Sequence, residues 1–322
     1  MPDFVTHATF ALDLINKLDN EKLKDILSKH QSSYFLGAQG PDVFYVHQLF
    51  SLKRNPLYDG LGNVMHDTKV KDFFVESIKY LKNNYSEILH SYLFGFMCHN
   101  VLDRSAHPYV YHVTGEGDKK YRGNHVRLER AIDSWFIINR WNVSSPHRFK
   151  IYKHILNFRL NKNIFVPYYN YVLNKVFNIK NGGEVFINSA INYKRYSKIL
   201  YDPFGIKKKF ARWVDIHFNK TGKIVLETLF YYKNIDDTID YMNFNKKEWH
   251  HPVLNEMKST ESFLDLYNHG LNEAKNEIGT INLYLDNSID ETELKSKIRD
   301  LSYATGLNCT DNNDMKYFNV IF

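Results

Sequence analysis

Residues 86–107 read SEILHSYLFGFMCHNVLDRSAH. Because this stretch is strongly apolar and contains no proline, we expect a buried helix. His99, Asp103 and His107 are spaced four residues apart, and each step of four turns by only about 40° around a helix axis. The imidazole, the carboxylate and the second imidazole therefore share one face of a largely hydrophobic element.

Polar groups on a buried face are costly unless they are hydrogen-bonded, paired or bound to a metal ion. A single histidine on a helix is more often a hydrogen-bonded structural residue than a ligand. Three such groups on one stripe are expensive to bury together, so this stretch favours a metal site, provided that other segments supply further ligands.

Further candidate ligands occur elsewhere in the chain. His125 and Glu129 lie one helical turn apart in HVRLE, a spacing at which helical side chains chelate zinc, although an HxxxE pair also arises by chance. His66 lies in NVMHDTKV, and His7 lies in the first predicted helix. Asp42 follows Gly-Pro, where a turn residue or a helix cap is the alternative interpretation.

The joint pattern is more specific than any of its parts. Five imidazoles and three carboxylates, with only two cysteines in the chain, suit a borderline divalent metal such as zinc. The candidate metal ligands are His7, Asp42, His66, His99, Asp103, His107, His125 and Glu129.

Helical periodicity dominates the rest of the chain, which predicts an all-α fold. The expected helices cover, approximately, 6–18, 21–30, 71–84, 86–107, 125–141, 147–161, 166–178, 184–202, 208–219 and 259–279. Asn124 is the expected cap of the helix that follows it. INLYLDNSID, residues 281–290, is the best candidate for a strand, and the alternative is that it begins a helix.

The chain shows no internal repeat and no low-complexity linker. We expect residues 1–305 to form a single, mainly helical metal-binding catalytic domain, and residues 306–322 to form a C-terminal tail. A chain of 322 residues is long enough to bury a sizeable core, and the aromatic content of 16% indicates a bulky one.

The charge is mildly basic, with a net +6 that would favour phosphate-bearing substrates or anionic surfaces. Lys207, Lys208 and Lys209 form the main basic run, interpreted as a solvated helix face, with a lipid or nucleic-acid contact as the alternative. The first residues lack the features of a signal peptide, and no apolar stretch reaches the length of a membrane span. These observations predict a soluble, cytoplasmic protein.

The order of GAQGPD, an isolated histidine, HNVLDRSAHP and HVRLE resembles the zinc-dependent phospholipase C family. This family includes the bacterial phosphatidylcholine-hydrolysing enzymes and, more distantly, the P1-type nucleases. The resemblance covers roughly residues 1–135, and WHHPVLNEMKSTESFLDLYNHGLNEA, residues 249–274, resembles a later family segment. It implies a multi-helix bundle around a zinc cluster.

The resemblance also implies which residues hold two to three zinc ions. The first ion would take Asp42, His66, His99 and Asp103, and the second would take His107, His125 and Glu129. The third would share Asp103 and use His7 with the amino terminus of the chain. In the secreted relatives that terminus is a tryptophan, whereas this chain begins Met-Pro. The amine of Pro2 or the side chain of Asp3 would then serve, or the third site would stay empty.

The implied activity is that of a hydrolase acting in lipid metabolism, a phospholipase C that releases a phosphorylated headgroup and diacylglycerol from glycerophospholipids. Asp42 would orient or deprotonate the attacking water in addition to binding metal. Asp133, one turn beyond Glu129, is expected to orient a metal ligand through a hydrogen bond. The alternative is that it is an exposed charge on the helix. The expected partners are a phosphodiester substrate and a transient membrane surface, with no obligate nucleic-acid partner.

Members of the family select the lipid headgroup through residues near the amino terminus and after the GPD turn. The matching residues here are Asp3, Phe4, Val43 and Phe44. Three alternatives to the phospholipase remain. The first is a P1-type nuclease with the same site, and the second is a phosphohydrolase that resembles the HD superfamily through His66-Asp67. The third is a helical metal-binding protein without catalytic activity.

Overall fold

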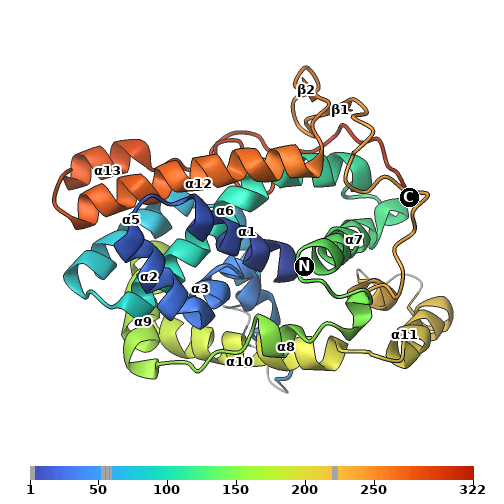
Figure 1. Ribbon diagram of the computed structural model, residues 1–322, viewed down its shortest axis with the longest axis horizontal. Coiled ribbons are helices and arrows are strands. Elements are labelled where there is room, and N and C mark those ends of the chain that lie inside the picture. Colours follow the sequence, from blue (N-terminus) through green and yellow to red (C-terminus); the bar gives the residue numbers. More distant parts are fainter. Residues whose placement is uncertain (1–3, 52–54, 56–57, 59, 220–223) are drawn as a thin grey trace.

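The computed structural model describes residues 4–51, 55, 58, 60–219 and 224–322, and the described chain is mainly helical (Figure 1). The first half contains the helices α1 (Phe4–Lys17), α2 (Glu21–Lys29), α3 (Gln31–Gly37), η1 (Gly40–Val46), α4 (Leu61–Asp67), α5 (Val70–Asn83), α6 (Glu87–Thr114), η3 (Lys119–Tyr121) and α7 (Asn124–Asn139). The prediction of an all-α fold is confirmed.

The second half continues this pattern, with one small hairpin before the last two helices. Its elements are η4 (Pro146–Arg148), α8 (Ile151–His154), α9 (Lys162–Phe177), α10 (Gly182–Leu200), α11 (Ile206–His217), η5 (Leu226–Leu229), the antiparallel strands β1 (Trp249–His250) and β2 (Lys258–Ser259), α12 (Phe263–Leu285) and α13 (Glu291–Lys297).

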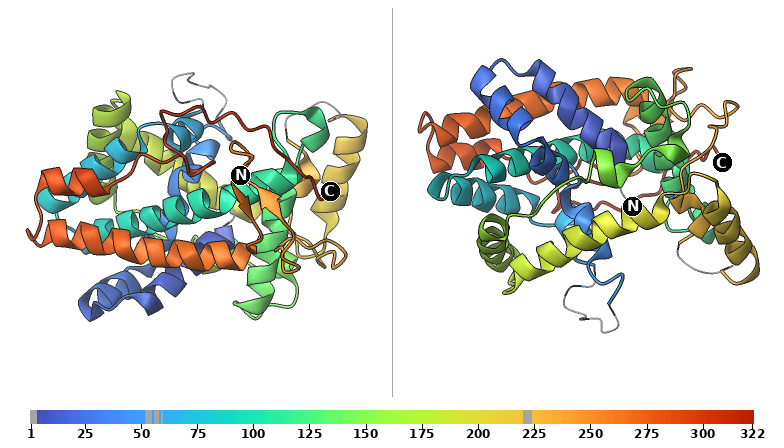
Figure 2. Two further views of the ribbon diagram at one scale, coloured as in Figure 1. Left: turned by 90° about the horizontal axis from the view of Figure 1, so that it is seen from above. Right: turned by 60° about the horizontal axis from the view of Figure 1, so that its bottom comes forward.

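Helix α6 runs through the middle of the molecule, between α12 on one side and α9 and α10 on the other (Figure 1). The view from above shows α12 lying alongside α6 (Figure 2). A helix that is apolar on nearly all sides is expected in such a position, because every face then finds an apolar partner. Helix α6 continues through Pro108 to Thr114, several residues beyond its predicted end.

Two glycines let α3 and α6 pack backbone against backbone. A Cβ atom on Gly37 would lie 1.9 Å from the carbonyl oxygen of Tyr92, and one on Gly95 would lie 2.1 Å from that of Tyr34. Neither contact is sterically possible for a larger residue. This close approach brings η1, which directly follows α3, against the polar half of α6.

An aromatic cluster fills the space between the amino-terminal half of α6 and helices α9 and α10. The ring of Tyr92 lies 5.0 Å from that of Phe165 and 5.6 Å from that of Phe186, measured between centroids. Tyr169 stacks on Phe186 at 4.1 Å, and Tyr168 is also buried. Much of the high aromatic content therefore serves the helical core, as the sequence predicts.

Three local predictions are wrong. The helix expected over 147–161 is only the short η4 and α8, because Phe149 and Lys150 between them leave helical backbone geometry. Residues 281–285 continue α12, so the strand is wrong and the helical alternative holds for these residues, although they end a helix and do not begin one. Gly123, not Asn124, occupies the cap position of α7, and the Asn124 side chain instead donates to the carbonyl of Thr114 at 3.2 Å, which ties the end of α6 to α7.

The C-terminal segment after α13 packs onto the rest of the chain without helical structure. Its backbone donates from Tyr303 to the carbonyl of His66 at 3.0 Å, and from Asn319 to that of His112 at 2.8 Å. The predicted boundary between residues 305 and 306 stays a prediction. Within the described ranges, each helix is too short or too polar to cross a lipid bilayer.

Candidate metal centre

Five helices bring the candidate ligands to one place. His7 comes from α1, Asp42 from η1 and His66 from α4. The three-residue stripe comes from α6, as its spacing predicts, and the HxxxE pair comes from the first two turns of α7. All eight side chains are buried or largely buried. The sequence places these residues up to 122 positions apart, so their meeting is a property of the fold.

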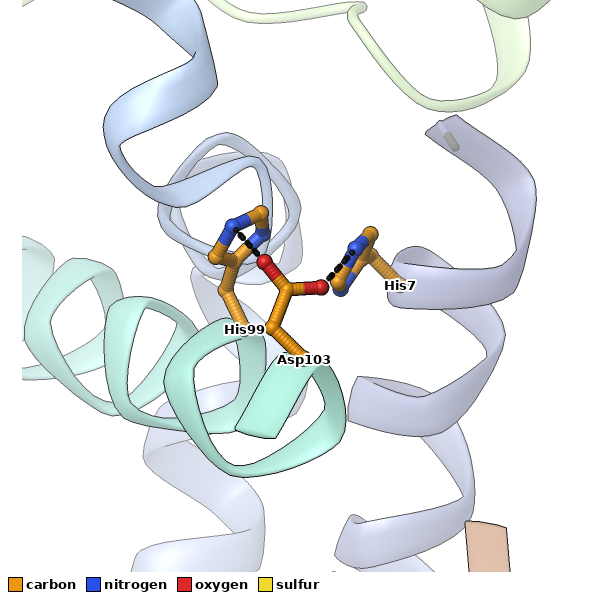
Figure 3. Close-up of side chains that lie close together, drawn as sticks. All are labelled: His7, His99 and Asp103. Atoms are coloured by element: carbon orange, nitrogen blue, oxygen red, sulfur yellow. Dashed lines mark ion pairs between the residues drawn. The ribbon is translucent and has the colours of Figure 1, made fainter. Parts of the chain in front are cut away.

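Asp103 lies at the centre of the group. Its Oδ1 atom is 3.1 Å from Nε2 of His7 and 3.7 Å from Nε2 of His107. Its Oδ2 atom is 3.0 Å from Nε2 of His99 and 3.8 Å from Nε2 of His66. Figure 3 shows the carboxylate between the rings of His7 and His99, with one oxygen facing each. The two oxygens of one side chain therefore face ligands on both sides.

Asp42, His66 and His99 form a second grouping beside Asp103. Oδ1 of Asp42 is 3.2 Å from Nε2 of His66, and Oδ2 is 3.6 Å from Nε2 of His99. Gly40 makes this approach possible, because it adopts a φ of +52° and a Cβ atom there would lie 2.3 Å from Cδ2 of His99. The glycine of the Gly-Pro-Asp turn thus leaves room for the ligand ring.

His107, His125 and Glu129 form the third grouping. Oε1 of Glu129 is 2.9 Å from Nε2 of His125 and 3.6 Å from Nε2 of His107. Candidate donor atoms of these three residues lie within 4.8 Å of one another, as do those of Asp42, His66 and His99, and those of His7, His99 and Asp103.

Backbone carbonyl groups orient three of the histidine rings. Nδ1 of His66 lies 2.7 Å from the carbonyl oxygen of Gly62, and Nδ1 of His99 lies 3.1 Å from that of Ala38. Nδ1 of His107 lies 2.9 Å from the carbonyl oxygen of Tyr303. A ring that donates from Nδ1 keeps the lone pair of Nε2 free, and in all three rings Nε2 points toward the carboxylates. Metal-binding histidines are commonly held in this way.

The donor set fits zinc ions. Nε2 of His99 is fully buried and makes no hydrogen bond in the described structure, although it faces Asp103 and Asp42. Oε2 of Glu129 is also buried and makes no hydrogen bond in the described structure. Buried polar atoms without a partner are costly, and a cation among imidazole nitrogens and carboxylate oxygens removes that cost. Nitrogen and oxygen ligands in groups of three or four are those of zinc sites.

The carboxylates of the centre stay ionised despite their burial. Burial opposes the charge of Asp42, but His99 and His66 outweigh it and hold the pKa of Asp42 below its ordinary value. Burial acts in the same direction on Asp103, and His107 and His99 hold its pKa well below the ordinary value.

In the third grouping, burial and neighbouring charges also oppose each other, here for His107 as well as for a carboxylate. Burial lowers the pKa of His107, but the charges of Asp103 and Glu129 raise it to about 9. Burial would raise the pKa of Glu129, and His125 more than reverses this. The centre therefore concentrates negative charge that attracts either protons or metal cations.

A cavity of about 100 Å³ opens onto the centre. Seven of the eight candidate ligands line it, and the remaining described lining residues are Tyr45, Asn63, Asp67, Tyr111 and Ala304. Sequence reasoning missed Tyr45 and Tyr111, whose rings lie 5.6 Å from His66 and 4.7 Å from His125. Tyr111 lies four residues beyond His107, so the continuation of the same stripe along α6 was a usable signal.

Tyr303 was also missed, and no sequence signal connects it with the centre. It is buried, its carbonyl accepts from His107, and its ring lies 4.9 Å from that of His66. It belongs to the C-terminal segment, which reaches the centre only because that segment packs back onto α4 and α6.

Asp133 is fully buried, so the alternative of an exposed helix charge is wrong. Its carboxylate accepts from the backbone N–H groups of Val5 and Thr6 at 3.0 and 2.7 Å, and from the hydroxyl groups of Thr6 and Tyr231. These bonds satisfy the free N–H groups at the start of α1. Asp133 therefore supports the helix that carries His7, and none of its recorded bonds goes to a ligand ring.

The expected headgroup residues do not all face the cavity. Phe4, Val43 and Phe44 are buried in the core, and none of them is among the described residues that line the cavity. Asp3 and the amino-terminal ligand of the third site fall on residues 1–3, outside the described residues. Among the described residues, Asp67 lines the cavity but belongs to none of the three ligand groups, so the HD interpretation has less support than the phospholipase resemblance.

A family model described as zinc-dependent phospholipase C matches residues 6–179. The chain belongs to the zinc-dependent phospholipase C family. All eight candidate ligands lie within the matched part, with His7 near its start. Neither the comparison with curated proteins nor that with solved structures found a match. Family membership supports a zinc-dependent hydrolase of phospholipase C type in general terms, with a lipid substrate class.

Proposed function

We propose that this zinc-dependent phospholipase C family member hydrolyses the phosphodiester bond of glycerophospholipids and releases a phosphorylated headgroup and diacylglycerol. The observation that carries the proposal is the position of Asp103 at the cavity, where one carboxylate oxygen faces His7 and the other faces His99. A bridging carboxylate is what a multi-metal phosphodiesterase requires, because neighbouring ions lie only about 4 Å apart.

The three groupings support the assignment of ligands to ions that the family resemblance implies. One ion would be held by Asp42, His66, His99 and Asp103, and another by His107, His125 and Glu129. A third would be held by His7 and Asp103. Zinc ions bound there would neutralise the phosphate oxygens and lower the pKa of water toward about 7. A cytoplasmic location stays a prediction.

Asp42 would accept a proton from the attacking water. It lies on η1 at the cavity wall, and its histidine neighbours keep it ionised. A carboxylate that is already deprotonated is ready to accept a hydrogen bond from water and to orient it toward phosphorus. Asp42 would therefore combine metal binding with a catalytic role.

Tyr45 and Tyr111 would position the substrate phosphate. Both line the cavity, Tyr45 beside His66 and Tyr111 beside His125. Burial raises the pKa of Tyr111 well above its ordinary value, so this hydroxyl group keeps its proton. A neutral phenol donates a hydrogen bond to an anionic phosphodiester oxygen without competing for the metal ions.

The test is hydrolysis by zinc-loaded protein of phosphatidylcholine vesicles, of a soluble chromogenic phosphodiester and of single-stranded DNA. We expect headgroup release by the wild type and a loss of at least about a thousandfold in Asp103→Ala. Asp42→Asn should retain most of the zinc, measured by elemental analysis, and still lose activity. Leu283→Ser, an exposed change on α12, serves as the control.

Two outcomes would contradict the proposal. Cleavage of DNA alone, abolished in Asp103→Ala, would establish the nuclease alternative at the same centre. Zinc bound at two or three ions per chain without hydrolysis of any of the three substrates would favour the catalytically inactive alternative.

A further inference from the structure

Helix α11 is turned with its polar side toward the protein and its apolar side toward solvent. The side chains of Lys208, Ala211 and Asp215 face inward: Ala211 is buried, and the carboxylate of Asp215 accepts from the backbone N–H groups of Leu226 and Glu227 at 3.0 and 2.8 Å. This is the reverse of an ordinary surface helix, which buries its apolar face.

Lys208 confirms the inward direction of the polar face. Its Nζ atom lies 4.1 Å from the centroid of the Tyr232 ring, and burial lowers its pKa to about 8. The lysine run at 207–209 is therefore only partly the solvated face that the sequence predicts, since Lys207 and Lys209 are exposed and Lys208 is half-buried.

The outward face and the residues that flank the helix carry six large, exposed apolar side chains. The exposed fractions are 81% for Phe204, 67% for Ile206, 64% for Phe210, 47% for Trp213, 53% for Ile216 and 75% for Phe218. Positions 206, 210 and 213 recur at the spacing of one helix face. The rings of Phe210 and Trp213 stack at 5.8 Å, and Phe218 lies 5.3 Å from Trp213. Exposed apolar groups of this size mark a binding surface.

The exposed charged side chains of the helix itself are positive, and one of them, Arg212, lies 3.8 Å from the carboxylate of Glu227. Lys207, Lys209 and Arg212 are exposed. Asp215 is the only acidic residue between 204 and 218, and it faces the protein. A second copy of the chain docking through the same face would bring these cations together, which is unfavourable. The exposed apolar face with cations beside it is complementary to a partner surface that has an apolar interior and negative charges at its boundary.

We propose that residues 204–218 bind in the plane of a lipid bilayer that contains anionic headgroups. Helix α11 has twelve residues, too few to span a bilayer, so its apolar face would enter only the boundary between headgroups and acyl chains. Trp213 would lie at the depth that tryptophan prefers, and the cations would extend to the lipid phosphates. Helix α11 lies at the edge of the molecule in every view (Figures 1 and 2), where a flat surface can reach it.

This inference is independent of the proposed hydrolysis, because residues 204–218 and the candidate ligands have no member in common. The test is flotation of the purified, zinc-loaded protein with vesicles of phosphatidylcholine alone, or with about 30% phosphatidylserine. Samples are kept in the cold for minutes so that the vesicles remain intact. We expect the protein to bind the vesicles that contain phosphatidylserine at least about tenfold more tightly than those of phosphatidylcholine alone.

The decisive variant is Phe210→Ser with Trp213→Ser. Both side chains are exposed, so the fold should be unchanged, while binding should fall at least about tenfold. The matched control is Met257→Ser with Leu283→Ser, which removes two other exposed apolar groups elsewhere and should bind as the wild type does. Lys209→Glu should weaken binding to the anionic vesicles, and Lys175→Glu, an exposed change on α9, should not.

Tryptophan emission separates insertion from adsorption. Trp213 is the most exposed of the four tryptophans, so vesicle binding should shift the emission to shorter wavelength, and Trp213→Phe should remove the shift. The proposal is overturned if the wild type does not bind anionic vesicles, or if the double variant binds as well as the wild type. It is also overturned if the wild type is a dimer that the double variant converts to a monomer.

Discussion

The two halves of α6 bury their side chains by different means. The amino-terminal half, around Tyr92 and Phe96, packs against aromatic rings from α5, α9 and α10. The carboxyl-terminal half, from His99 to His107, buries imidazoles and a carboxylate against other polar ligands. One continuous helix therefore joins a region stabilised by apolar contact to a region whose polar groups need partners.

The difference shows what each region depends on. Aromatic packing needs only the chain itself, since burial of apolar surface is favourable without further components. The metal centre holds mutually repelling carboxylates and partnerless imidazole nitrogens, so its stability depends on what the site binds. The following predictions test this division, from the largest expected effect to the smallest.

Removal of zinc should have the largest effect and should act on the carboxyl-terminal half. Each ion present at a thousand times its Kd contributes about 4 kcal/mol to the free energy of unfolding. Two or three ions should therefore raise the melting temperature by about 10 °C or more. The measurement is calorimetry before and after exhaustive chelation, followed by addition of zinc. An unchanged melting temperature would show that the centre does not hold structural ions.

Phe165→Ala should weaken only the aromatic half. Phe165 is buried against Tyr92 and Phe186, so its truncation leaves a cavity that costs about 3–5 kcal/mol. The zinc content per folded chain should not change, because no ligand contacts this ring. Urea unfolding and elemental analysis measure the two quantities. Loss of zinc together with stability would mean that the two halves of α6 are coupled.

Acid should act on the aromatic half through His90. Burial lowers the pKa of this imidazole to about 4, and its ring lies 4.3 Å from that of Phe94. A histidine whose folded pKa is depressed contributes its full stability above about pH 6.5 and loses it as the pH falls toward 4, by about 3 kcal/mol in total.

The measurement for His90 is the free energy of unfolding between pH 7 and pH 4 in chelated protein, so that release of metal does not contribute. His90→Gln should show a flatter dependence than the wild type over this range. Equal slopes for the two proteins would mean that His90 stays accessible to water and carries no such linkage.

Asp133→Asn should have the smallest effect and should act on the metal-centre side. The substitution removes a charged acceptor from the amino-terminal end of α1, at a cost of about 1–2 kcal/mol. The ion held through His7 should be released first when zinc is titrated out with a weak chelator. Asp286→Asn, a change at the far end of α12, is the control. Identical titrations for both variants would assign Asp133 to the fold alone.

Periodic stretches explain how far the sequence could be interpreted. Helix α6 was predictable because its apolar length and its four-residue stripe are local features, and the ends of α5 and α10 fall close to their predicted positions. The region 147–161 was not, because its short helices are set by contacts such as the bond from His147 N to the carbonyl of Tyr232. The strands β1 and β2 have two residues each and leave no periodic signal.

By itself, the sequence determined the all-α class, the family and the set of eight candidate ligands, because these depend on residue types at fixed spacing. Only the tertiary structure decided that Asp103 faces both sides of the centre, that Tyr303 orients His107 and that Asp133 caps α1. It also decided that the apolar side of α11 faces solvent. Side chains separated by a hundred or more residues meet through packing, and spacing along the chain carries no record of that meeting.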